Sequence, residues 1–330
     1  MLPVQIAGLG SYLPARRVLN AELEDQLGIT PGWIERVTGV CERRYAGPDD
    51  TVVTMATAAA QEALAQAGRT VADVDAIISA STTPYQLIPC TAAFVQAALG
   101  APEGGSACWD MNATCLSFMV ALYNAAHLVS AGAYRTVLIV SSEINRRTLN
   151  PTQRESTVLF GDAAAAAVLT RTPPGAESAV WHAEFATYSS GADLAQCRGG
   201  GSRHHPNDPA TTPEMNLFDM QGPRLFKFGA RLVGPMMTRV LDRLEWPREE
   251  IDQVVPHQAS GHAVALLTTA LGFRPDQVFL NLPQRGNCIA ASIPLALTEA
   301  VAAGRIQRGS RVLLAGTGAG VTLGGLGLTY

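Results

Sequence analysis

The order of apolar segments in the first half of the chain recurs in the second half, and this restricts the possible folds strongly. Three pairs of segments match in the same order: residues 74–100 with 251–272, 128–142 with 300–316, and 159–170 with 316–329. Chance similarity between Ala- and Gly-rich segments is the alternative, but it does not account for the retained order. A duplication of this length predicts two similar halves packed against each other.

Within the first half, apolar runs typical of strands alternate with Ala-rich segments of helical spacing. Strands are predicted at Val4–Gly8, Asp75–Ala80 and Thr136–Ser141, and helices at Thr51–Ala67, Cys90–Leu99 and Leu116–Ala131. Runs that are apolar throughout are typical of strands buried on both faces. The chain is therefore predicted to be α/β, with one half at residues 1–172 and the other at 173–330. Residues 199–213, rich in Gly and Pro, are predicted to form a surface excursion.

Composition excludes several classes of function. Of the 330 residues, 47% are apolar, and the formal net charge of −4 gives no global attraction to nucleic acid or to an anionic membrane. The apolar runs fall far short of the ~20 residues that a transmembrane helix needs. The six cysteines include no CxxC pair, and the first residues show no signal-peptide pattern. We therefore expect a cytoplasmic enzyme with reduced thiols and no metal site.

Three residues at the ends of predicted elements could carry chemistry. Cys115, in "DMNATCLSFMVAL", opens a predicted helix, whose dipole favours the thiolate. His257, in "VVPHQAS", follows an apolar strand, and the carboxyl ends of strands are where α/β sheets place their sites. Asn287, in "RGNCIAAS", lies in a turn before another helix. Taken singly, each has a plain structural alternative: a packed thiol, a core histidine and a turn residue.

Together these residues lie in motifs that resemble a known family, the β-ketoacyl-acyl-carrier-protein synthases III, which are condensing enzymes of the thiolase fold. The motifs are the Cys115 segment, "FGD" at Phe160–Asp162, "PHQA" at Pro256–Ala259, "GN…AASIPLAL" at Gly286–Leu297 and the turn Gly316–Gly320. The resemblance runs from "GLGSYLP" at Gly8 to the last strand. It implies a five-layer αβαβα architecture with two duplicated halves, and a homodimer.

The resemblance also implies an acyltransferase of fatty acid or related biosynthesis that uses coenzyme A thioesters as substrates and needs no metal or redox cofactor. Cys115 would attack an acyl-CoA and become an acyl-enzyme. Malonyl-ACP or malonyl-CoA would then lose carbon dioxide, with His257, through Nε2, and Asn287 donating hydrogen bonds to the enolate. Backbone N–H groups of Cys115 and Ala319 would form the oxyanion hole.

Residues at the substrate entrance follow the family only in part. By resemblance, the residues that bind coenzyme A or the carrier are Trp33, Arg36, Arg154, Phe226, Lys227 and Ser260. Three positions depart from the pattern, because Val37 and His262 replace arginines and Pro223 replaces an asparagine. Since docking of an acidic carrier needs basic residues, the residues leave open whether the acceptor is carried on acyl carrier protein or on coenzyme A.

The acyl pocket is also expected to differ from the family. Ile88 replaces a bulky aromatic residue that caps the pocket across the dimer interface, and Leu116 and Ser117 follow the nucleophile where small residues are commoner. We expect a primer longer than acetyl. Two other readings remain: an acyltransferase or non-decarboxylative condensing enzyme of a specialised pathway, and a silent partner of a paralogue. The presence of Asn287 favours decarboxylation, and the intact trio disfavours the silent partner.

Overall fold

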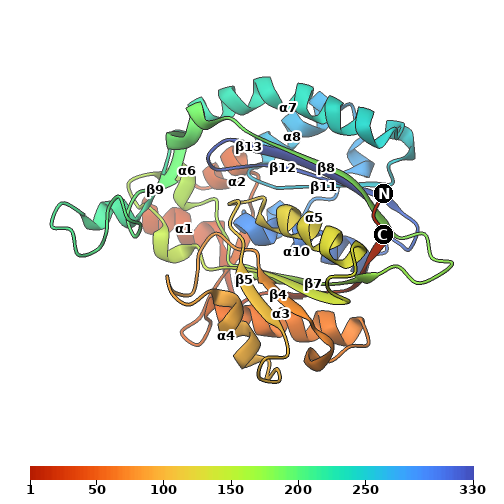
Figure 1. Cartoon of the computed structure of the whole chain (residues 1–330). Helices are drawn as coiled ribbons and strands as arrows, with labels where there is room; N and C mark the ends of the chain where they lie inside the picture. The colour runs from red at the N-terminus through yellow and green to blue at the C-terminus, as the bar shows by residue number, and fades with distance from the viewer.

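The computed structural model describes the backbone of all 330 residues and every side chain except that of residue 270. Two mixed sheets form its framework (Figure 1). In the N-terminal half the strand order is β1 (Val4–Tyr12), β7 (Ala163–Arg171), β6 (Thr136–Glu143), β4 (Ala76–Ser79) and β5 (Ala107–Asp110). In the C-terminal half the order is β8 (Ala179–Thr187), β13 (Thr322–Thr329), β12 (Arg311–Gly318) and β11 (Gln253–Pro256).

The two sheets share one topology. In each, two antiparallel pairings (β1–β7–β6 and β8–β13–β12) are followed by a parallel one (β6–β4 and β12–β11). In the first sheet, β5 pairs in parallel with the free side of β4. At the matching place in the second sheet, Val254 of β11 forms a single parallel bridge with Val278. The segments that match in sequence therefore occupy matching places. The predicted duplicated halves are confirmed, and the division at residue 172, between β7 and β8, stays a prediction.

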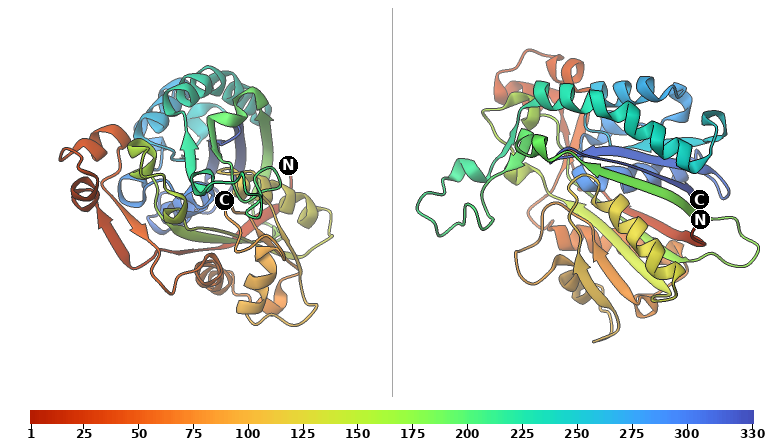
Figure 2. Two further views of the ribbon diagram at one scale, coloured as in Figure 1. Left: turned by 90° about the vertical axis from the view of Figure 1, so that its left-hand side faces the viewer. Right: turned by 45° about the horizontal axis from the view of Figure 1, so that its top comes forward.

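Helices complete five layers (Figures 1 and 2). Helices α3 (Val52–Gln66) and α4 (Thr91–Ala98) cover the outer face of the first sheet, and α7 (Gly222–Leu244) and α8 (Gly261–Leu271) cover the second. Helices α5 (Ser117–Ser130) and α10 (Ser292–Ala302) lie between the sheets and contact both. Because α5 and α10 are mostly apolar around their circumference, burial between two sheets stabilises them. Helix α5 consequently lies between strands of both sheets.

The remaining elements lie around this framework. They are β2 (Arg16–Leu19), α1 (Asn20–Leu27), α2 (Trp33–Thr38), β3 (Glu42–Tyr45), α6 (Arg154–Thr157), β9 (Ala195–Cys197), β10 (Phe218–Met220) and α9 (Leu282–Arg285). Strands β9 and β10 pair at the base of an arm that projects from the body, and the arm contains the predicted excursion at residues 199–213 (Figure 1). No helix of the described chain has both the length and the apolar character needed to span a bilayer.

The predicted elements agree with the observed ones within a few residues, and β1 differs most. It continues to Tyr12 instead of ending at Gly8. A Cβ on Gly8 or Gly10 would lie 2.2 Å from a backbone oxygen of α3. The two glycines thus allow α3 to pack directly on the strand, and they do not mark its end.

Candidate active site

The predicted nucleophile lies in a sharp turn between β5 and α5. Thr114 has a φ of 53°, a left-handed conformation that is costly for a β-branched residue. The turn is held by Asn112 Oδ1, which accepts from the Thr114 N–H at 2.9 Å, and by Ser117 Oγ, which accepts from the Ala113 N–H at 3.0 Å. This geometry places Cys115 at the N-terminal end of the buried helix.

Two glycines of β12 allow the nucleophile turn and His257 to approach the same strand. A Cβ on Gly318 would lie 2.5 Å from Thr114 Oγ1 and 3.5 Å from the Cys115 nitrogen. A Cβ on Gly316 would lie 2.7 Å from the Cβ of His257 and 3.0 Å from Leu116. Because these positions carry no side chain, the structure brings together a cysteine of the first half and a histidine of the second.

His257 is held neutral by its surroundings. It follows β11, its N–H donates to Ala315 O at 2.7 Å, and it is 5% exposed. Burial lowers the pKa of its imidazole to about 4. Among the described side chains, none pairs with its buried Nδ1. Since an orphaned N–H is rarer in proteins than an orphaned acceptor, we assign the proton to Nε2, which makes this atom a donor.

Asn287 is fixed by backbone pairing with the "FGD" segment. Its N–H donates to Leu159 O at 2.9 Å, and its carbonyl accepts from the Gly161 N–H at 3.0 Å. The side-chain Oδ1 accepts from the Ile289 N–H at 2.8 Å, and Nδ2 lies 3.5 Å from Ala259 O in the "PHQA" segment. The amide therefore has a defined orientation, with its donor group toward the segment that carries His257.

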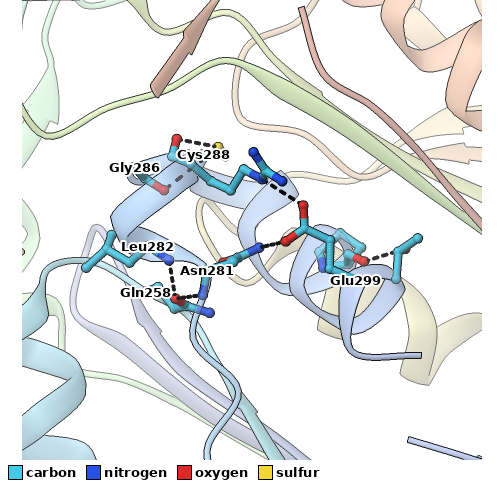
Figure 3. Close-up of polar contacts among 9 residues, drawn as sticks. Gln258, Asn281, Leu282, Gly286, Cys288 and Glu299 are labelled. Carbon is cyan, nitrogen blue, oxygen red and sulfur yellow. Dashed lines mark hydrogen bonds and ion pairs between the residues drawn. The ribbon is translucent and has the colours of Figure 1, made fainter. Parts of the chain in front are cut away.

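Gln258 ties the His257 segment to the chain that leads to Asn287 (Figure 3). Its Oε1 accepts from the N–H groups of Asn281 at 3.0 Å and Leu282 at 2.8 Å. Gln258 is 1% exposed, so these bonds form away from water and hold both segments firmly.

A second set of contacts continues from Asn281 to the turn before Asn287 (Figure 3). Glu299 of α10 accepts from Asn281 Nδ2 at 2.9 Å and from Arg285 Nε at 2.7 Å. The predicted partners His257 and Asn287 are thus connected through one carboxylate on the central helix layer.

Backbone strain gathers around this site. Of the residues that the structure describes, four other than glycine have a positive φ, and three of them, Thr114, Ile289 and Val321, lie within two residues of Cys115, Asn287 and Ala319, respectively. Such conformations cost roughly 1–3 kcal/mol each and persist where the surrounding structure enforces them. Their distribution supports a functional role for these three turns.

The sulfur of Cys115 lies where both predicted oxyanion donors can reach it. The backbone N–H groups of Ala319 and of Cys115 itself act on this sulfur by lowering the pKa of the thiol, so both favour negative charge there. Burial raises the pKa of its thiol to about 12, and the charge of Glu143 adds to the increase. The resting site is therefore a neutral thiol beside a neutral imidazole, and the two N–H groups would stabilise negative charge as it develops.

Glu143 is the residue of this region that the sequence reasoning missed. It closes β6, two residues beyond the predicted strand, and is fully buried. An acid directly after a run of buried apolar residues, in "VLIVSSE", was a detectable signal, since buried carboxylates are rare without a specific role.

The predicted entrance residues divide into two groups. Trp33 and Arg36 on α2, Arg154 on α6, and Ser260 at the N-cap of α8 come from elements that contact one another, and Phe226 and Lys227 are exposed on α7 beside α8. His262 Nδ1 lies 3.1 Å from Val37 O, so two of the departures from the family pattern are in direct contact. Ile88, in contrast, is 83% exposed.

Leu116 and Ser117, the two residues after the nucleophile, have defined packing and hydrogen-bonding roles. Leu116 is fully buried and faces Gly316 and Gly324 between the sheets, while Ser117 caps the nucleophile turn. Among the described residues, no three His, Cys, Asp or Glu side chains are grouped as metal ligands. The expectation of no cofactor stays a prediction.

Comparisons with known proteins agree with this geometry. Residues 109–189 match the family model of 3-oxoacyl-[acyl-carrier-protein] synthase III, and residues 241–330 match the model of its C-terminal part. A β-ketoacyl-[acyl-carrier-protein] synthase III of Symbiobacterium thermophilum is 38% identical over 99% of this chain and 98% of its own. One from Streptomyces coelicolor is 37% identical over 98% and 96%.

A solved structure gives the same result. The 3-oxoacyl-[acyl-carrier-protein] synthase III of Aquifex aeolicus superimposes with a TM-score of 0.89 at 33% identity, covering 99% of this chain and 100% of that one. The predicted thiolase-type fold is confirmed. On the strength of the two family models and of relatives similar over nearly their whole length, the chain belongs to the 3-oxoacyl-[acyl-carrier-protein] synthase III family of acyltransferases.

Proposed function

We propose that this protein condenses an acyl-CoA primer with a malonyl thioester, releasing carbon dioxide, through an acyl group carried on Cys115. The observation that supports this most is the approach of Cys115, His257 and Asn287 in a chain of the synthase III family. The site offers a nucleophile and neutral hydrogen-bond donors, which are the groups that acyl transfer followed by decarboxylation requires.

In the first step the Cys115 sulfur attacks the carbonyl carbon of the acyl-CoA. A new carbon–sulfur bond forms, and the bond to coenzyme A breaks. The thiol proton leaves with coenzyme A, which departs as a free thiol. The carbonyl oxygen carries negative charge on the way, and the N–H groups of Cys115 and Ala319 stabilise it. Removal of one such donor typically costs ~10²–10³ in rate.

In the second step the malonyl thioester loses its carboxylate as carbon dioxide. The electron pair of the broken carbon–carbon bond forms an enolate, whose oxygen accepts hydrogen bonds from His257 Nε2 and Asn287 Nδ2. The enolate carbon attacks the acyl-cysteine, and the sulfur leaves as the thiolate. A histidine with a pKa of about 4 suits this role, because at neutral pH it donates without carrying a charge.

The acceptor in our proposal is the malonyl group on an acyl carrier protein. Exposed basic residues lie on the elements around the expected entrance: Arg36, Arg154, Arg224, Lys227 and Arg231. A surface of this charge complements an acidic partner helix. Val37 and His262 remove positive charge from the same rim, so malonyl-CoA is the alternative that the experiment below includes.

We further propose a homodimer that forms through the edge of the first sheet. Strand β5 has an unpaired edge in the described chain, and beside it Tyr85, Leu87 and Ile88 are 45%, 70% and 83% exposed. An open strand edge next to exposed apolar side chains is suited to pairing with a second copy. The proposed compartment is the cytoplasm, where reducing conditions keep the Cys115 thiol free.

The test is a product assay with a series of acyl-CoA primers and with either malonyl carrier protein or malonyl-CoA. We expect 3-oxoacyl product and carbon dioxide in equal amounts, a primer optimum above acetyl, and faster turnover with the carrier protein. Cys115→Ala is the matched control and should form no product. Product without carbon dioxide release would contradict the proposal and favour a non-decarboxylative acyl transfer.

A further inference from the structure

Glu143 is a buried acid to which the steps above give no role. It is fully buried, and in the part of the chain that the structure describes it forms no ion pair with a basic side chain. Burial raises its pKa to about 7. A buried carboxylate without a counter-charge is costly, so a purely structural position would be better filled by an apolar residue.

The carboxylate is used instead as a triple acceptor. Oε1 accepts from the Thr82 N–H at 2.6 Å, and Oε2 accepts from Thr83 Oγ1 at 2.8 Å and from the Thr83 N–H at 3.3 Å. These two threonines begin the segment of residues 82–90, whose tip carries the exposed Leu87 and Ile88. Glu143 therefore fixes the base of this segment.

The same contact continues to the nucleophile. The Thr82 carbonyl accepts from Asn112 Nδ2 at 3.3 Å, and Asn112 Oδ1 accepts from the N–H of Thr114 at 2.9 Å. Thr114 is the strained residue directly before Cys115. A continuous set of hydrogen bonds thus runs from the carboxylate through Thr82 and Asn112 to the nucleophile turn.

We propose that Glu143 is a positioning residue that fixes the 82–90 segment and the nucleophile turn relative to each other, so that an acyl donor reaches the Cys115 sulfur in one geometry. The inference rests on the proposed function, since it concerns the acylation step. A carboxylate is required because both of its oxygens accept from backbone N–H groups, whereas an amide would direct an N–H₂ group at one of them.

The charge and the geometry of Glu143 have opposite effects on Cys115, which makes the inference testable. The charge raises the pKa of the thiol, so it lowers the intrinsic reactivity that an unspecific reagent measures. The hydrogen bonds, in contrast, support acylation by a thioester that has to be positioned. A variant that loses the carboxylate should therefore react faster with an unspecific thiol reagent and be acylated more slowly by a thioester.

The experiment compares Glu143→Gln with the wild-type chain in two assays. Acylation of Cys115 by an acyl-CoA is followed by intact-protein mass, and alkylation by iodoacetamide is followed at pH 8. We expect acylation to fall by about 10- to 100-fold, the range that a misplacement on the order of 1 Å produces. We expect alkylation to rise by more than twofold, since removal of a nearby like charge lowers the pKa of the Cys115 thiol.

Asn112→Ala separates positioning from electrostatics and from folding defects. Asn112 is exposed, so the variant should fold, and Glu143 with its charge is retained. We expect acylation to fall by about tenfold while alkylation stays within twofold of wild type. In the double variant the loss of acylation should be no larger than in Glu143→Gln alone, because both changes interrupt one set of bonds.

Glu184→Gln is the matched control, since it removes a carboxylate whose ion pair with Arg239 lies on the surface of the other half. It should leave both rates within twofold of wild type. If Cys115 of Glu143→Gln or of Asn112→Ala is acylated at a rate within threefold of wild type, the inference is overturned. Losses of acylation rate that multiply in the double variant would overturn it as well. A wild-type chain that no acyl-CoA acylates would contradict the proposed function itself, which is a separate result.

Discussion

Replacement of Gly316 by alanine should displace His257 without removing any group that takes part in the chemistry. The new Cβ would lie 2.7 Å from the Cβ of His257 and 3.0 Å from Leu116. Carbon atoms pack best at about 3.5–4.0 Å, so His257 has to move by about 1 Å. Overpacking of this kind costs about 1–3 kcal/mol of stability, and a 1 Å shift of a catalytic group can cost about 10²-fold in rate.

The assay separates the two half-reactions. Cys115 is first acylated by an acyl-CoA, and the discharge of the acyl group by a malonyl thioester is then timed by mass spectrometry. We expect Gly316→Ala to discharge about 10²-fold more slowly while acylation changes far less, because His257 is needed mainly for the enolate.

Gly327→Ala provides the matched control on the neighbouring strand. Its Cβ would lie 2.4 Å from the side chain of Leu244 on α7, outside the candidate site. A similar loss of stability with unchanged discharge is expected for this variant. Unchanged discharge in Gly316→Ala, or an equal loss in both variants, would refute the argument that β12 holds His257 in place.

Three further predictions follow from single contacts. The pKa of His257 is about 4 in the folded chain, so the unfolded state binds a proton between pH 6.5 and 4 that the folded state does not, and stability falls as pH decreases through this range. This pH-dependent loss of unfolding free energy, about 3 kcal/mol over the whole range, should be absent in His257→Asn. Urea unfolding of both chains at pH 7 and pH 4.5 would test it. In Gly161→Ala the Cβ would meet Arg285 O at 2.1 Å; we expect a loss of about 3 kcal/mol, measured by denaturant unfolding, and a displaced Asn287. Glu299→Gln removes the ion pair with Arg285 and should slow malonyl discharge about tenfold while acylation is unchanged; equal slowing of both half-reactions would contradict the positioning role of this network.

Much of the fold could be predicted because local pattern and long-range packing agree in this chain. Apolar runs such as Thr136–Ser141 are buried on both faces of a sheet, and a strand of this kind has few alternatives. Local patterns do not show how the strands are distributed between sheets. The duplication did indicate this, because it implied that each strand has a counterpart in a second sheet. The strand β1 was predicted too short because glycines usually interrupt strands, whereas here they allow a helix to pack closely.

For the candidate site, the sequence indicated which chemical groups to consider but not the contacts that support them. Cys115, His257 and Asn287 each lie at the end of a regular element, which is visible in the sequence. The contacts of Gly316 and the connection through Glu143 depend on distances between segments that are far apart in the chain.

The decisive measurement for the acyl-cysteine route is the mass of the intact protein after two successive incubations, first with an acyl-CoA and then with malonyl carrier protein. We expect the wild-type chain to gain one acyl mass on Cys115, and the malonyl thioester to remove it with one equivalent of carbon dioxide. The Asn287→Asp variant should gain the acyl mass and retain it. An acyl mass on any residue other than Cys115 would contradict its role as the nucleophile, and discharge that proceeds equally well in Asn287→Asp would contradict the role of Asn287 in decarboxylation.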